Sequence, residues 1–205
     1  MYLTIKENVQ VEWIEKKSVF ISSIFHVENQ EEVDFYLNNI RSKYYDATHN
    51  VYAYTYGIDY PIQKYSDDGE PQGTAGLPVM EVIKRNNLKN VLIVVTRYFG
   101  GILLGAGGLT RAYSKSASLA IEKAGILRYI DCKRFKIIVE YSFLEQTKKL
   151  LERFSSKIIE INYSDVVDLD IVISKEEFDS FIKEITELTS GGVLIDNVCD
   201  TIEAI

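Results

Sequence analysis

A run of apolar residues followed by a cluster of glycines constrains the fold of this chain most. Residues 91–97, VLIVVTR, are almost continuously apolar and β-branched, which predicts a strand in the middle of a sheet with both faces covered. Five of the nine residues 100–108 are glycine, and a helix rich in small residues is expected at 109–124. Glycine loses more backbone entropy on folding than any other residue. The cluster therefore indicates close backbone approach or unusual backbone dihedral angles.

The remaining patterns predict an α+β protein with two domains, residues 1–130 and 131–205. In the first domain we expect strands at 9–16, 18–27 and 49–57, a helix at 29–44 with Asn29 as N-cap, a long loop at 58–77, and a helix from Pro78. In the second, the order is β-α-β-β-α-β, which is the ferredoxin-like motif. Its two helices are expected to begin at capping boxes, Ser142 with Glu145 and Ser174 with Glu177.

Charge and cysteine usage limit the class of protein. Residues 1–130 carry 14 basic and 14 acidic side chains, so the net charge of −7 arises entirely in residues 131–205. Neither half is strongly basic, which argues against nucleic-acid binding through bulk charge alone. Cys132 and Cys199 are far apart and are expected to be buried thiols in a reducing compartment. With no signal-peptide pattern and no membrane-length apolar run, a cytoplasmic protein without a membrane partner is expected.

Two segments, 66–78 and 97–111, have the pattern of an anion site because each ends where a helix is expected to begin. A helix N-terminus exposes unpaired N–H groups and the positive end of the helix dipole. Arg97 and Arg111 would hold phosphate, and Tyr98 and Phe99 would stack on bases. The other candidates are Gly100, Gly101, Gly105, Gly107, Gly108 and Thr110 in the second segment, and Gly73, Thr74 and Gly76 in the first. Alternatively, the glycines only permit tight turns and close packing, since neither segment matches a known phosphate or dinucleotide fingerprint.

An enzymatic alternative rests on acidic residues beside the first glycine segment. Asp67, Asp68 and Glu70 would bind a hard cation, and His49 would act as a general base. The competing interpretation is a solvated turn with a structural histidine. No Ser-His-Asp or Cys-His arrangement is readable, and no cofactor is expected.

Three long motifs are similar to the YigZ/IMPACT family. They are DATHNVYAY at 46–54, YSDDGEPQGTAGLPVMEVI at 65–83 and VLIVVTRYFGGILLGAGGLTRAY at 91–113. The resemblance implies a first domain similar to the fourth domain of elongation factor G, and a second domain similar to the fifth. Leu77 stands where many bacterial members have a lysine, which removes a cation beside the first glycine segment.

The resemblance implies no settled enzymatic activity, but it links the eukaryotic members to translational control. The leading hypothesis is therefore a non-enzymatic binding protein in translation or its regulation, with RNA, a ribosome or a protein as partner. The rival is a metal-assisted enzyme acting on a phosphorylated small molecule or nucleotide. A third hypothesis is an interaction module whose acidic second domain meets a basic protein.

Overall fold

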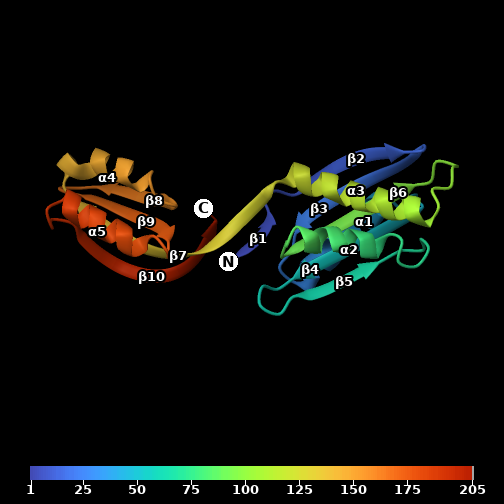
Figure 1. Cartoon of the computed structure of the whole chain (residues 1–205), viewed down its shortest axis with the longest axis horizontal. Coiled ribbons are helices and arrows are strands. Elements are labelled where there is room, and N and C mark those ends of the chain that lie inside the picture. The colour runs from blue at the N-terminus through green and yellow to red at the C-terminus, as the bar shows by residue number, and fades with distance from the viewer. Residues whose placement is uncertain (205) are drawn as a thin grey trace. The chain divides into compact units, whose positions relative to one another are not determined.

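The computed structural model describes residues Met1–Ala204, which form two units (Figure 1). The first unit consists of residues 2–127, and the second consists of Met1 together with the residues from 128 onward. Each unit contains one β-sheet with helices packed on it. The two-domain α+β organisation expected from the sequence is therefore confirmed.

The sheet of the first unit has the strand order β2-β3-β6-β4-β5, and every adjacent pair runs antiparallel. Its strands are β2 (Val9–Glu15), β3 (Ser18–His26), β4 (His49–Tyr56), β5 (Ile62–Ser66) and β6 (Val91–Tyr98). A short strand β1 (Tyr2–Ile5) precedes them, and its Leu3 forms a bridge with Leu88. The apolar strand expected at the centre of the sheet is β6, with strands on both sides.

Three helices cover the two faces of this sheet: α1 (Gln30–Lys43), α2 (Gly76–Arg85) and α3 (Ala106–Ala124). Leu92 and Val94 of β6 belong to a core cluster with α1, whereas Val91, Ile93 and Val95 belong to one with α2 and α3. Successive side chains of a strand point to opposite faces. β6 is therefore buried on both faces because each face has its own helical layer.

The structure differs from the expected boundaries around the glycine segments. The long loop expected at 58–77 contains β5, which pairs with β4 from Tyr56–Ile62 to Tyr52–Ser66. This edge strand is mostly exposed, so its sequence lacks the apolar alternation of a half-buried strand. Helices α2 and α3 begin at Gly76 and Ala106, two and three residues earlier than expected. Their first turns contain glycine, which has a low helix propensity and so concealed the helix starts.

The second unit has the element order β-α-β-β-α-β. Its elements are β7 (Ile126–Val139), a 3₁₀ turn η1 (Tyr141–Phe143), α4 (Leu144–Leu151), β8 (Ser156–Tyr163), β9 (Val167–Ser174), α5 (Phe178–Leu188) and β10 (Leu194–Ala204). The strands pair antiparallel in the order β10-β7-β9-β8. The core of the unit contains Phe135, Leu169 and Ile171 from the sheet and Phe181 and Ile185 from α5.

Two sequence expectations for the second unit are wrong. Neither serine caps a helix: Ser142 lies in η1 and Ser174 ends β9, and the N-cap side chains of α4 and α5 make no capping hydrogen bond. Cys132 is buried as expected, but Cys199 is exposed on the edge strand β10. None of the helices between Met1 and Ala204 combines the length and the hydropathy that a membrane span requires.

Candidate functional site

The two glycine-containing segments line one cavity of about 430 Å³ in the first unit. Figure 1 shows the loop between β5 and α2 and the loop between β6 and α3 at the same end of this unit. The apolar lining of the cavity comes mainly from Pro71, Phe99, Leu103, Leu104 and Leu109. The remaining lining residues are Thr48, His49, Gly69, Glu70, Arg97, Gly105 and Ala106. The site is therefore a largely apolar cavity with one charged region.

Buried polar side chains form the charged region. Arg97 Nη1 lies 2.5 Å from Glu70 Oε1, and the two side chains are only 6% and 4% exposed. The Tyr113 hydroxyl, from α3, donates to the same Oε1 at 2.7 Å. Burial and the adjacent Glu70 carboxylate raise the pKa of Tyr113 far above its ordinary value, so the hydroxyl remains a donor. Glu70 thus connects the loop before α2 to both β6 and α3.

Arg97 occupies a different environment from that expected of a phosphate ligand. Its charge is paired with Glu70, and its Nη2 lies 3.4 Å from Ser18 Oγ. Its Cζ lies 5.5 Å from the Phe20 ring centroid and 5.6 Å from that of Phe99. A guanidinium neutralised in this way exerts little net attraction on a phosphate.

His49, at the start of β4, lines the cavity beside this pair. Its Nδ1 lies 2.7 Å from the backbone oxygen of Asp68, and its Nε2 lies 3.9 Å from Glu70 Oε2. Since a carbonyl oxygen only accepts, Nδ1 donates in this bond, and in the tautomer that is protonated at Nδ1 alone Nε2 is an acceptor. The histidine expected as a general base is thus held by a backbone bond with one nitrogen facing Glu70.

Asp67 occupies the N-terminus of α2. Its Oδ1 accepts from the N–H groups of Ala75 and Gly76 at 3.1 and 2.8 Å, and its Oδ2 accepts from Gly73 at 2.8 Å. Thr74 donates its hydroxyl to Pro71 O. The first glycine segment therefore already holds an anion, the Asp67 carboxylate, and offers no open site for a phosphate.

Replacing Asp67 by alanine is expected to lower the free energy of unfolding of the first unit by about 2 kcal/mol, because the N–H groups of Gly73, Ala75 and Gly76 lose their acceptor. Trp13 is the only tryptophan of the chain and packs near Phe20 in this unit. Its fluorescence during urea unfolding reports this loss. An unchanged urea midpoint would show that water replaces the carboxylate with no loss of stability.

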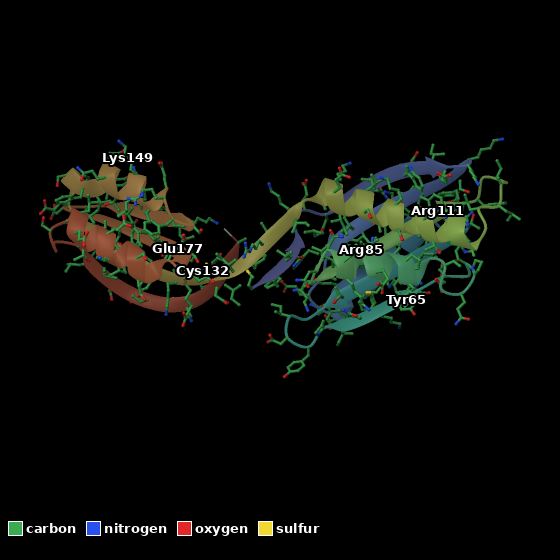
Figure 2. The ribbon with its side chains drawn as sticks, in the orientation of Figure 1. Tyr65, Arg85, Arg111, Cys132, Lys149 and Glu177 are labelled. Atoms are coloured by element: carbon green, nitrogen blue, oxygen red, sulfur yellow. The ribbon has the colours of Figure 1, made fainter. Side chains whose placement is uncertain are left out.

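The N-terminus of α3 is organised differently. Its N-cap Gly105 makes no side-chain capping bond, and its first turn contains no acidic residue. Thr110 bonds back to Ala106 O, and Arg111 is exposed (Figure 2). Unlike the start of α2, this helix start has no capping carboxylate among the described residues.

The glycines of both segments serve distinct structural needs. A Cβ on Gly100 would lie 2.1 Å from the Lys17 backbone, and one on Gly76 would lie 2.7 Å from the Ser66 backbone. Gly73, Gly101 and Gly105 have φ of 76°, 80° and 70°, in the left-handed region. Gly107 and Gly108 meet only side chains, Arg111 Nη1 at 3.6 Å and Leu104 Cβ at 3.1 Å. Close backbone approach or a positive φ thus explains why five of these seven positions are glycine. Neither explains the glycine at position 107.

The two aromatic candidates do not lie together. Phe99 lines the cavity and is 45% exposed. Tyr98, the preceding residue on β6, donates to Asp46 Oδ1 at 2.7 Å, a bond that raises the pKa of Tyr98 to about 12. Tyr98 is not among the residues that line the cavity. Only Phe99 is placed to stack on a ligand there.

The carboxylates of the enzymatic alternative do not form a cluster. Asp67 binds the start of α2, Asp68 Oδ2 accepts from Asn50 N–H at 2.6 Å, and Glu70 pairs with Arg97. Among residues 1–204, no group of three or more His, Cys, Asp or Glu side chains is arranged to hold a metal ion.

Sequence reasoning missed several residues of the site. Tyr113 lies in the helix expected at 109–124 and was not singled out, yet its hydroxyl donates to Glu70. Leu103 and Leu104 lie in the glycine segment, and Leu103 is 83% exposed. An apolar triplet, ILL at 102–104, inside a glycine-rich loop was the available signal, because loops between elements are normally polar.

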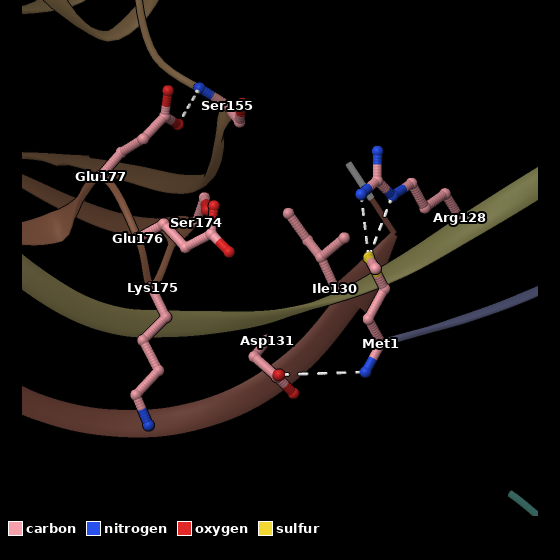
Figure 3. Close-up of a pocket in the computed structure, with 9 residues that line it drawn as sticks. All are labelled: Met1, Arg128, Ile130, Asp131, Ser155, Ser174, Lys175, Glu176 and Glu177. Atoms are coloured by element: carbon pink, nitrogen blue, oxygen red, sulfur yellow. Dashed lines mark hydrogen bonds and ion pairs between the residues drawn. The ribbon is translucent and has the colours of Figure 1, made fainter.

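A larger cavity of about 780 Å³ lies in the second unit and contains none of the candidate residues (Figure 3). Charged side chains of both signs line it, among them Arg128, Asp131, Lys175 and Glu177. Glu177 accepts from the Ser155 N–H at 2.8 Å, and the Met1 amine lies 3.8 Å from Asp131. The exposed Met1–Asp131 ion pair contributes little free energy.

Comparison with known proteins gives the family. Residues 16–121 match the Impact N-terminal domain, and residues 137–191 match a domain of unknown function, DUF1949. The chain belongs to the IMPACT family. IMPACT family member YvyE of Bacillus subtilis (strain 168) is 39% identical over 93% of this chain and 88% of its own length. IMPACT family member YigZ of Escherichia coli (strain K12) is 31% identical over 87% of this chain and 88% of its own length.

One solved structure shares the architecture of the whole chain. It is described as the crystal structure of a hypothetical protein, and it has a TM-score of 0.60 and 29% sequence identity. The likeness covers 95% of this chain and 96% of that chain. Every residue that lines the candidate cavity falls within the Impact N-terminal domain, so the site belongs to the family's defining domain.

Proposed function

We propose that this IMPACT family protein is a non-enzymatic binding protein of the cytoplasm that acts in translation or its regulation by binding single-stranded RNA. The role in translation is supported by the link between eukaryotic family members and translational control. The RNA site is the cavity of the first unit. One observation carries this proposal: an apolar cavity of about 430 Å³ ends at a helix start that has no capping side chain.

The start of α3 provides the phosphate subsite. The N–H groups of Gly107 and Gly108 lie in its first turn, and Leu109 N–H already donates to Gly105 O. A phosphate there would meet the positive end of a 19-residue helix. Because Gly107 has no Cβ, a ligand can approach the backbone closely. Arg111, one turn further along, supplies a charge-assisted donor.

The apolar part of the cavity provides the base subsite. Phe99 lines it and is backed by the Arg97 guanidinium, 5.6 Å from the ring centroid. Leu104 and Leu109 complete a surface on which a flat base is desolvated. Stacking of a base on an aromatic side chain contributes about 1–3 kcal/mol. A phosphate and a base one nucleotide apart are thus both accommodated.

Exposed cations surround this end of the unit. Lys16 and Lys17 form the turn between β2 and β3, and the Lys17 backbone adjoins Gly100. Lys115 follows Arg111 by one turn of α3. None of these four cations takes part in an ion pair between described residues. Although residues 1–130 have no net charge, these unpaired cations lie on the turn and the helix that adjoin the second glycine segment.

Replacing Gly107 by aspartate is expected to weaken RNA binding at least tenfold, because a carboxylate in the first turn of α3 would interact favourably with the positive end of the helix and repel phosphate. The same change is expected to leave stability unchanged or raise it. Fluorescence anisotropy with a labelled single-stranded RNA octamer of mixed sequence, at 50 and 150 mM KCl, measures the dissociation constant.

Ser118→Asp is the matched control for this experiment. It adds the same charge to an exposed position of α3, roughly 16 Å further along the helix, and should change the affinity less than threefold. Equal binding by the wild type and Gly107→Asp would contradict the site assignment. Co-sedimentation of the same three proteins with ribosomes tests the role in translation, and loss of sedimentation only in Gly107→Asp is the expected result.

A protein partner is the second candidate for this surface. Phe99, Ile102 and Leu103 are 45%, 41% and 83% exposed, an unusual concentration of apolar side chains on one loop. A partner protein would bury this loop and leave the start of α3 unused. Substituting Leu103 by aspartate would then abolish the complex, whereas Gly107→Asp would not affect it.

We also propose that the two units have the finer folds implied by the family resemblance. The first would be similar to the fourth domain of elongation factor G, which its helix-covered five-stranded sheet supports. The second would be ferredoxin-like, which its strand order β10-β7-β9-β8 supports. A structure superposition of each unit on these domains is the test.

A further inference from the structure

One oxygen of the Glu70 carboxylate makes no hydrogen bond to a described residue, although it lies in a largely apolar cavity. Oε1 accepts from both Arg97 and Tyr113. Oε2 takes part in no hydrogen bond between described residues, although the Glu70 side chain is only 4% exposed and lines the cavity. The oxygen faces the cavity, where a hydrogen-bond donor of a ligand can reach it. This oxygen therefore marks a position where a ligand donor belongs.

His49 places a second acceptor beside the first. Its Nδ1 donates to Asp68 O, so the neutral tautomer has its lone pair on Nε2, which lies 3.9 Å from Glu70 Oε2. Two acceptors cannot satisfy each other. Two hydrogens on one nitrogen diverge widely enough to reach acceptors about 4 Å apart at ordinary hydrogen-bond lengths. The arrangement matches an amino group, –NH₂.

We propose that the cavity selects an RNA base that carries an exocyclic amino group, which donates one hydrogen to Glu70 Oε2 and the other to His49 Nε2. This inference rests on the proposed RNA site. The ion pair with Arg97 neutralises Glu70, so the pair of acceptors recognises a neutral amino group rather than requiring a cation. Adenine, cytosine and guanine each carry such a group, and uracil does not.

Uracil is the base that the site rejects. It has no amino group, and carbonyl oxygens flank its one N–H, so its lone pairs would face the Glu70 carboxylate and His49 Nε2. A site built to accept hydrogen bonds discriminates strongly against an analogue without the donors, because its buried acceptors remain unpaired. Each such mismatch corresponds to a tenfold or larger difference in affinity.

The test compares single-stranded RNA octamers of adenosine, cytidine, uridine and purine riboside, by anisotropy with the full chain. Purine riboside differs from adenosine only by the missing amino group, so it separates the amino contact from purine stacking on Phe99. Adenosine and cytidine octamers are expected to bind at least tenfold more tightly than uridine. The purine-riboside octamer is expected to bind at least tenfold more weakly than adenosine.

His49→Phe removes the second acceptor and keeps a ring of similar shape. It should reduce the adenosine-to-purine-riboside ratio from at least ten to below three, while the Trp13 unfolding transition stays that of a folded protein. Lys89→Gln, a charge change outside the cavity, is the control and should keep the ratio. Glu70→Gln serves as a second variant only if it retains the folded Trp13 signal.

The outcomes separate this inference from the proposed function. Equal affinity for adenosine and purine-riboside octamers, or a ratio that survives in His49→Phe, would overturn base selection while leaving RNA binding intact. Failure of every octamer to bind would overturn the RNA function itself, and the inference with it.

Discussion

The Gly100→Ala variant is expected to lose about 3 kcal/mol of unfolding free energy in the first unit. The added Cβ would lie 2.1 Å from the carbonyl carbon and oxygen of Lys17, a separation that atoms in a folded protein do not adopt. Relief requires the turn between β2 and β3 to move away from the end of β6. The Gly100 N–H also donates to Ser18 Oγ at 3.2 Å, so the same movement breaks a hydrogen bond.

Gly107→Ala is the matched control for this measurement because it makes the identical chemical change in the same loop and helix. Its Cβ would meet only Arg111 Nη1 at 3.6 Å, an ordinary contact, and alanine has the higher helix propensity. It should raise the unfolding free energy by a few tenths of a kcal/mol to about 1 kcal/mol. Urea titration followed by Trp13 fluorescence measures both variants. A similar midpoint for the two would refute the close approach at Gly100.

The sequence predicted the architecture correctly where the burial of an element determines its pattern of apolar residues. Residues 91–95 are apolar without alternation because α1 covers one face of β6 and α2 and α3 cover the other. That two-sided burial is what a continuous apolar run encodes. The β5 strand was missed because an exposed edge strand needs no apolar face. Its residue types therefore do not indicate that it pairs with another strand.

The sequence predicted two glycine segments at helix starts, but not whether they line one cavity or what their side chains contact. The glycines correctly directed attention to two helix starts, since close approach and positive φ both require glycine. The start of α2 is not open to a ligand because the Asp67 carboxylate accepts from its N–H groups. The spacing of residues in the sequence does not reveal that contact. Likewise, Arg97 and Glu70 are 27 residues apart, and only the fold pairs them.

Removal of the Glu70 carboxylate is expected to destabilise the first unit by about 3–5 kcal/mol. Glu70→Ala would leave the Arg97 guanidinium buried without its counter-charge, and breaking one side of a buried ion pair has an effect of this size. The Tyr113 hydroxyl would lose its acceptor at the same time. Urea unfolding monitored through Trp13 measures the loss, because Trp13 and this pair belong to the same unit.

The double variant Glu70→Leu/Arg97→Met should recover most of this stability, because no buried charge then lacks a partner. Asp170→Ala in the second unit is the control: it removes the partner of Arg134, whose side chain is 45% exposed, and it should not move the Trp13 transition. A loss below about 1 kcal/mol in Glu70→Ala would mean that water reaches Arg97. Full recovery of stability in the double variant, together with loss of adenosine selectivity, would show that the buried pair serves ligand recognition and is not required by the fold.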